Sequence, residues 1–364
     1  MIYYKSGGIH IFLKLFKVKG SNFPITCIVA LPSAILSAVM HYLFPEQSLK
    51  LYFLGEDSGG IVSESQAWAG FSFLVGFLIV FRTSQAYGRF WEGCTASHTM
   101  RAEWFDACSS LVSFCKASCA PPQEVWRFKH LLIRLTSMLH AAALAELESG
   151  DSNSASLFTR DYEMIDPGGV DKKSLETLMK TEARVELIFE WIQQLIVENI
   201  ETGVLSIPPP ILSRSFQELA NGMVAFHDAM KISYIPFPFP YAQSCDCLLI
   251  FHWLLVPIVT SQWVSHSLWA AVFCFIQVFI LWSLNLIAIE IDNPFGKDMN
   301  DIDATKMQEE INIHLGLLVT PTTERTPSLT KACGSMFLEK NSGLSMRKVK
   351  SSFSELLNEP QKYT

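Results

Sequence analysis

Three long stretches without a charged residue constrain the fold of this chain more than any other feature. They cover residues 24–44, 65–81 and 247–289. The first has 21 residues, and a helix of that length spans about 31 Å, the thickness of a bilayer's hydrocarbon core. The last has 43 residues, enough for two spans with a tight turn near 262–267. The sequence therefore predicts an all-α integral membrane protein with four transmembrane helices.

The uncharged spans and the charged segments around them divide the chain into six regions. Residues 1–23 carry four lysines and no acid, among alternating apolar residues. This pattern is typical of an amphipathic helix on the cytosol-like side of a membrane, and a targeting peptide is the alternative. The other regions are spans one and two (24–90), a helical cytosolic or stromal domain (91–243), spans three and four (244–291), an acidic segment with a helix (292–320), and a flexible tail (321–364).

Helical periodicity and proline positions divide the domain 91–243 further. Helices are expected over 89–119, 123–148, 174–201 and 211–230, and no strand-type alternation of any length appears. Three prolines alternate with aromatic and apolar residues in 235–241. We expect that segment to be extended or broken where the chain re-enters the membrane.

One face of the second span carries three phenylalanines. Phe73, Phe77 and Phe81 follow one another at i, i+4 and i+8, so their rings point to one side of a helix. No proline falls between Ser65 and Cys119, and Arg82 is the first charge, so one helix should leave the bilayer and continue into water. The stripe is either a packed core seam or a hydrophobic constriction where several copies surround an axis.

The sequence contains no signature of a soluble enzyme or a nucleic-acid binder. It is 49% hydrophobic and 17% charged, its mean hydropathy is +0.25, and its net charge of −7 is spread out. No two of the nine histidines are three or four residues apart, and no C-x-x-C, G-x-S-x-G, H-E-x-x-H or Walker A motif is present. We therefore predict that the protein is not an enzyme and needs no cofactor.

Several acids follow the last span, at positions 292, 298, 301 and 303. They do not form an EF-hand, because a loop that starts at Asp298 would place Asp303 where glycine is needed. A solvated acidic segment is the simpler interpretation. The alternative is a calcium site, in which the turn of Pro294, Phe295 and Gly296 supplies backbone oxygens beside two carboxylates.

Three motifs together resemble the bestrophin family of anion channels, with the plant and algal branch most similar. They are RTSQAYGRFWEG, IPFPFPYAQ and DNPFGKDMND, in this order and at these separations. The likeness covers roughly residues 1–315. The resemblance implies an all-helical homopentamer around one axial pore that conducts chloride and other monovalent anions, with bicarbonate as a further candidate.

The resemblance also implies roles for individual residues. Counted back from Arg89, the family's hydrophobic neck falls on the same three phenylalanines, and Ile211 becomes a second, cytosolic aperture. A calcium clasp would use the carboxylates of Asp298 and Asp301, a backbone oxygen at Asn293 and another near Tyr4. Lys297 replaces the first acid of the clasp, and Met299 and Asn300 interrupt the rest.

Two other functional classes stay open from the sequence. The first is a helical membrane scaffold that conducts nothing, and the second is a secondary transporter, although no inverted repeat or intramembrane carboxylate relay is visible. The likeness to the photosynthetic branch makes a thylakoid membrane the first candidate location. The plasma membrane is the alternative.

Overall fold

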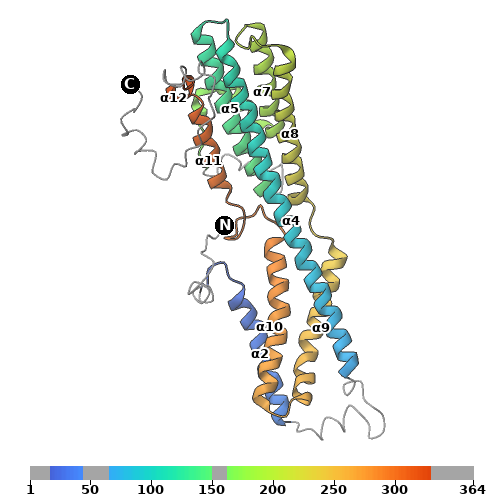
Figure 1. Ribbon diagram of the computed structural model, residues 1–364. Coiled ribbons are helices and arrows are strands. Elements are labelled where there is room, and N and C mark those ends of the chain that lie inside the picture. The colour runs from blue at the N-terminus through green and yellow to red at the C-terminus, as the bar shows by residue number, and fades with distance from the viewer. Residues whose placement is uncertain (1–16, 44–64, 150–161, 329–364) are drawn as a thin grey trace, which may run out of the picture. The chain divides into compact units, whose positions relative to one another are not determined.

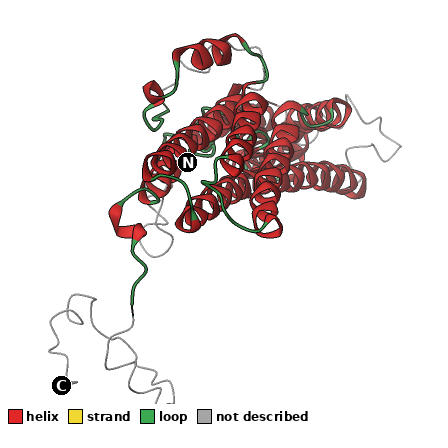
Figure 2. Cartoon of the chain, turned by 90° about the horizontal axis from the view of Figure 1, so that it is seen from above, coloured by secondary structure: helices red, strands yellow, loops and turns green. Residues whose placement is uncertain are grey.

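The computed structural model describes residues 17–43, 65–149 and 162–328 (Figures 1 and 2). Over these ranges the chain consists of helices and loops, and no strand occurs in them. The chain divides into two units, residues 1–318 and 319–364. In the described part of the second unit, the one helix is α12 (Pro321–Glu324). The expected all-α architecture is confirmed.

Four helices of the first unit are long and apolar enough to cross a membrane. Their bounds are α2 (Phe23–Leu43), α4 (Ser65–Phe114), α9 (Phe239–Trp263) and α10 (Ser267–Ile291). Helix α10 packs against the other three (Figure 1). At their centre, Ala30 of α2, Val256 of α9, and Cys274 and Val278 of α10 are fully buried. Hydroxyl pairs add to this packing, as between Ser37 and Thr260, whose oxygens are 2.9 Å apart.

The remaining α-helices of the first unit form a second bundle with the far half of α4. They are α5 (Pro122–Ser149), α6 (Lys172–Lys180), α7 (Arg184–Glu201), α8 (Pro209–Tyr234) and α11 (Ala304–Leu317). Two short 3-10 turns, η1 (Cys115–Ala117) and η3 (Pro167–Gly169), join some of them. The most extensive pairing is between α4 and α8, which lie side by side (Figure 1).

Helix α4 belongs to both bundles. It has 50 residues, which corresponds to about 75 Å of continuous helix. Val75 and Ile79, near its start, are buried with Cys245 and Leu249 of α9. Farther along, the buried Trp104 lies against Gly222 of α8, where an added Cβ would be 2.4 Å from the indole ring. A single rigid element therefore joins the membrane bundle to the second bundle.

Two expected elements differ from the structure. The segment 174–201 is expected to be one helix, but it breaks between α6 and α7, and across the break the Arg184 Nε donates to the carbonyl of Leu178 (3.3 Å). No glycine or proline marks this break. The segment 235–241 is expected to be extended or broken, but α9 begins at Phe239, and Pro240 lies in its first turn, where its missing N–H costs nothing. Residues 235–238 are the non-helical part of this segment.

Glu146, near the end of α5, is expected to make the stability of the fold depend on pH. Burial, and to a lesser extent the charge of Glu186, raise the pKa of this carboxyl from 4.5 to about 7, while Arg184 opposes the shift. The folded protein therefore holds this proton more tightly than the unfolded chain, and its contribution to stability falls as pH rises from about 4.5 to about 7. The measurement is the melting temperature in detergent of the wild type and of Glu146→Gln.

The variant should gain on the wild type as pH rises through that window, because glutamine never ionises. Glu182 is exposed between α6 and α7, so Glu182→Gln serves as the matched control and should follow the wild type at every pH. A constant difference between Glu146→Gln and the wild type across this range would show that Glu146 is not the group responsible.

Candidate functional site

Helix α4 has two different faces within the membrane. The face with Val75 and Ile79 is buried against α9, while Phe73, Phe77 and Phe81 lie on the other side with 71%, 58% and 42% of their surface exposed. Phe81 alone of these three has a described aromatic neighbour, Tyr241 of α9, at a ring-centre distance of 5.6 Å. The stripe is therefore not part of the core of a single chain.

Small residues flank the three phenylalanines on the same face. At about 100° per residue, Gly70, Ser84 and Gly88 fall within about 20° of the mean direction of the stripe. A Cβ added at either glycine would meet no atom within 4 Å. The exposed face of α4 is thus bulky over about 12 Å of the helix axis and slender on both sides of that stretch.

Ile211 lies far along the chain from this stripe. It is in the first turn of α8, where its N–H donates to the carbonyl of Pro208 (3.0 Å). Its side chain is exposed. Since α8 runs 26 residues, or about 39 Å, before the chain re-enters the membrane at α9, Ile211 belongs to the end of α8 away from the membrane bundle.

The segment after α10 forms a tight turn that packs on α4. Phe295 is buried, and a Cβ added at Gly93 would be 2.6 Å from Pro294 and 3.3 Å from the Phe295 ring. The side-chain oxygen of Asn293 accepts from the Phe295 N–H (3.2 Å). Glycine at 93 therefore permits this close approach, which no larger residue would allow.

Two of the expected calcium ligands lie together in this turn. The buried Asp301 carboxylate accepts from the Asp298 N–H at 2.7 Å. Burial, together with the nearby charges of Asp298 and Glu290, raises the pKa of Asp301 to about 6. Two acids that repel each other in this way suit a hard cation.

The rest of a calcium site is less complete. In the described parts of the chain, no three His, Cys, Asp or Glu residues are grouped to hold a metal ion. Asn293 and Asp301 each use one oxygen on the turn itself, and Tyr4 lies outside the described residues. A calcium ion here would take Asp298, Asp301 and backbone oxygens.

A charged cluster that was not expected lies directly behind the phenylalanine stripe. One nitrogen of Arg82, Nη1, donates to Asp246 of α9 (2.7 Å) and to Asn285 of α10 (2.8 Å). The signal for this cluster was present in the sequence, because Arg82 and Asp246 are isolated charges beside otherwise uncharged spans. Ionisable residues at such places are costly and often functional, but sequence alone did not show that these two meet.

Arg89, two turns after Arg82, joins three segments. It lies 2.9 Å from the Asp292 carboxylate, and its Nη2 donates to the carbonyls of Ile232 (3.0 Å) and Ile235 (2.8 Å). It thereby ties α4 to the ends of α8 and α10. Arg89 is the second arginine of the motif RTSQAYGRFWEG.

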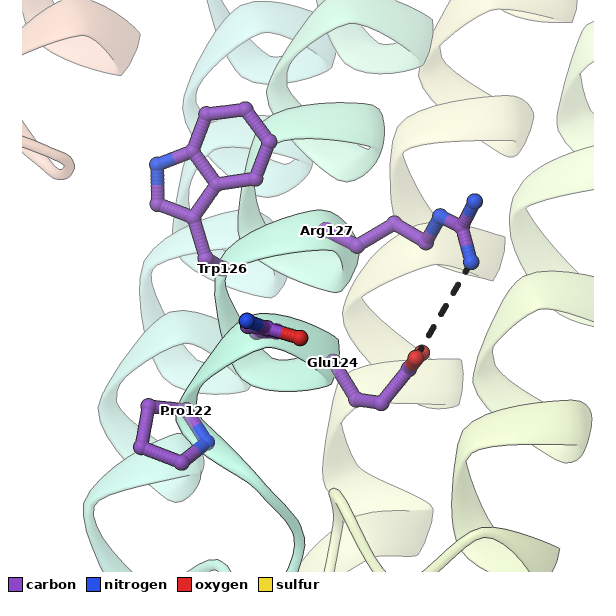
Figure 3. Close-up of a pocket in the computed structure, with 5 residues that line it drawn as sticks. Pro122, Glu124, Trp126 and Arg127 are labelled. Atoms are coloured by element: carbon purple, nitrogen blue, oxygen red, sulfur yellow. Dashed lines mark ion pairs between the residues drawn. The ribbon is translucent and has the colours of Figure 1, made fainter.

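A surface hollow elsewhere in the described structure does not involve any of these residues. It has a volume of about 520 Å³ and is lined by the first turns of α5, from Pro122 to Arg127 (Figure 3). Figure 3 shows Glu124 and Arg127 facing each other, with Glu124 Oε1 and Arg127 Nη1 3.9 Å apart. Its polar groups belong to one helix end and do not converge on a common point.

Comparison with known proteins gives a consistent result. The family model described as "Bacterial/Fungal Bestrophin protein" matches residues 14–316. A voltage-dependent anion channel-forming protein of Nostoc sp. is 27% identical over 242 residues, which are 64% of this chain and 70% of that protein. A second protein of the same description, from Synechocystis sp., is 26% identical over 258 residues, 68% of this chain and 75% of that protein.

Solved structures agree on the fold. The crystal structure of a bacterial bestrophin homologue from Klebsiella pneumoniae, phased with zinc, superposes with a TM-score of 0.61 at 14% identity. It covers 83% of this chain and 99% of that one. A point mutant of the same homologue gives a TM-score of 0.63, also at 14% identity, over 82% and 99% of the two chains. At this identity, the likeness concerns the arrangement of the helices.

Proposed function

Because this chain belongs to the bestrophin family, we propose that it forms a membrane channel that conducts chloride and other monovalent anions passively, with bicarbonate as a further candidate. The observation that carries the proposal is the exposed stripe of Phe73, Phe77 and Phe81 on a helix whose other face is buried. The names of the two relatives as anion channel-forming proteins support the same function.

The proposed pore is formed by several copies of α4 around one axis, in a homopentamer. Rings of Phe73, Phe77 and Phe81 would then narrow the pore over about 12 Å, and the small residues Gly70, Ser84 and Gly88 would widen it at both ends. The exposure of the stripe on a single chain is what such an assembly requires, because the rings must face the axis and not their own bundle.

The chemistry of a phenylalanine neck suits anions. Ring edges are electropositive, so anions can approach them in the plane of the ring. The tube is also apolar enough to close by losing its water. Because an anion must shed part of its hydration to pass, weakly hydrated anions should permeate more readily than strongly hydrated ones.

Calcium control and location follow as further parts of the proposal. Asp298 and Asp301, with backbone oxygens at Asn293 and Tyr4, form the proposed calcium clasp, and the pairing of the two acids supports it. The thylakoid membrane and the plasma membrane both stay as candidate locations. Placement in the plant and algal branch also stays a prediction.

The test is anion flux into liposomes that contain the purified protein. Chloride, bicarbonate and sodium are compared, each with calcium and with a chelator. Flux of anions without sodium is the expected result, and a calcium response would assign the clasp. A well-folded oligomer that carries no anion flux under either condition would contradict the proposal and favour a scaffold.

Ile211→Ala is expected to change which anions pass while leaving gating nearly unchanged. An isoleucine has no electropositive ring edge, so at this position it can select only by size. The measurement is the permeability of a series of anions of different size, from reversal potentials in planar bilayers. Altered gating with unchanged relative permeabilities would remove Ile211 from the aperture.

A further inference from the structure

Arg82 and Asp246 are opposite charges on two different membrane helices, and they meet where those helices pack together. Asp246 is the single charged residue in α9, and Arg82 is the first in α4. Their atoms Nη1 and Oδ1 are 2.7 Å apart, and Asn285 of α10 accepts from the same nitrogen. The pair therefore joins three of the four membrane helices at one level.

That level is the end of the proposed neck. Arg82 follows Phe81 directly, so the two differ by about 1.5 Å along the helix axis. The mean direction of the phenylalanine stripe is about 140° away from Arg82 around α4, so the guanidinium lies behind the pore wall. The partner helix reaches the neck as well, since Tyr241 of α9 touches the Phe81 ring.

The two partners of this pair are buried to different degrees. The Arg82 side chain is 11% exposed, whereas that of Asp246 is 50% exposed. The field of a guanidinium at that depth is weakly screened by its apolar surroundings. The carboxylate beside it cancels most of that field, so the pair as a whole is nearly neutral.

A second ion pair continues the same seam between α4 and α10. Arg89 and Asp292 follow Arg82 and Asn285 by seven residues on their helices, and they are 2.9 Å apart. Ala86 and Ala288 lie between the two contacts, beside a cavity of about 90 Å³ that Arg82 and Asp292 also line. The cavity between the two pairs is therefore large enough to hold water. The partners that hold Arg82 in place are Asp246 and Asn285.

We propose that the Arg82–Asp246 pair determines how strongly the channel favours anions. Asp246 limits the positive field that Arg82 projects into the end of the neck, and Arg82 prevents the carboxylate from repelling anions there. This inference rests on the proposed function, because it assigns the residues that tune conduction through the same pore. The two partners are expected to have opposite effects when each is neutralised alone.

The test uses three variants in planar bilayers under a potassium chloride gradient. Asp246→Asn keeps the shape and leaves Arg82 positive, so chloride conductance should rise about threefold and selectivity over potassium should increase. Arg82→Gln leaves Asp246 negative, so chloride conductance should fall about threefold and the reversal potential should move towards that of potassium. The double variant Arg82→Gln with Asp246→Asn should return the reversal potential to the wild-type value.

A matched control removes a similar pair from the same helix. Arg101 pairs with Glu310 of α11, about 29 Å farther along α4, so Arg101→Gln should leave the reversal potential unchanged. Arg82→Lys, which keeps the charge, should retain wild-type selectivity. If Arg82→Gln does not assemble, Asp246→Asn and Arg82→Lys still carry the test.

The outcomes separate this inference from the function on which it rests. Reversal potentials that shift in opposite directions in the two single variants support it. If the contact were merely structural, both variants would lose conduction. If the wild type conducts anions but the reversal potentials of the two single variants shift in the same direction, or do not shift, this inference is overturned. The channel function then stays in place. A wild type without anion current overturns the proposed function and this inference together.

Discussion

Replacing Phe73, Phe77 and Phe81 together by alanine is expected to raise the single-channel conductance about tenfold, which corresponds to a barrier lowered by about 1.4 kcal/mol, and to abolish closure of the pore. Alanine leaves the neck wide enough to stay wetted, so the dry state that blocks ions is lost. Because the three rings are exposed on the chain, the fold should survive. The measurement is single-channel recording in planar bilayers, with the oligomeric state checked by size-exclusion chromatography.

Phe71 provides the matched control for this experiment. It is on the same helix but half-buried, with its ring 5.6 Å from Trp68 and 6.3 Å from His252. Phe71→Ala should lower stability and leave conductance as in the wild type. If the triple variant instead loses about 3–5 kcal/mol of stability per residue, as core truncations do, with no change in current, the stripe is a packing seam.

Trp104→Ala is expected to cost about 3–5 kcal/mol of the free energy of unfolding, because it removes a large buried side chain and leaves a cavity. Trp104 is fully buried where α4 meets α8, against Gly222, and its ring lies edge-on to His140 at 6.4 Å. Neighbouring backbone cannot close such a gap between two rigid helices. The measurement is chemical denaturation of the purified protein in detergent.

The same substitution at an exposed tryptophan shows whether burial is the cause. Trp126 of α5 is 61% exposed, so Trp126→Ala should change the free energy of unfolding by no more than about 0.5 kcal/mol. Equal losses for the two variants would mean that the α4–α8 contact does not hold the second bundle together.

Most of the helices could be predicted from the sequence, for local reasons. An uncharged segment long enough to span a bilayer is expected to form a helix there, because a helix pairs every backbone group within the segment. Prolines lie at the starts of α5, α8 and α9, although in α9 Pro240 lies in the first turn of a helix where the sequence predicts an extended segment. The break between α6 and α7 could not be predicted, because it depends on the side chain of Arg184 reaching the carbonyl of Leu178.

The candidate site also contains residues that could be predicted from the sequence and residues that could not. The alignment of Phe73, Phe77 and Phe81 follows from helical spacing, and the family likeness led to Ile211, Asp298, Asp301, Asn293 and Tyr4. The pair of Arg82 and Asp246 could not be found in this manner, since 164 residues of sequence separate its partners. No periodic pattern relates positions so far apart.

The sequence alone determined the number of membrane spans, the all-helical class and the family, because these depend on hydropathy, backbone pairing and motifs that are local in the chain. Only the tertiary structure decided which face of α4 is covered and which is free. That choice depends on where α9 and α10 pack, so Val75 and Ile79 are buried while the phenylalanines stay exposed. It also decided that two isolated charges meet behind the phenylalanine stripe, because an arginine within the bundle needs a partner that only the packing of three helices brings to it.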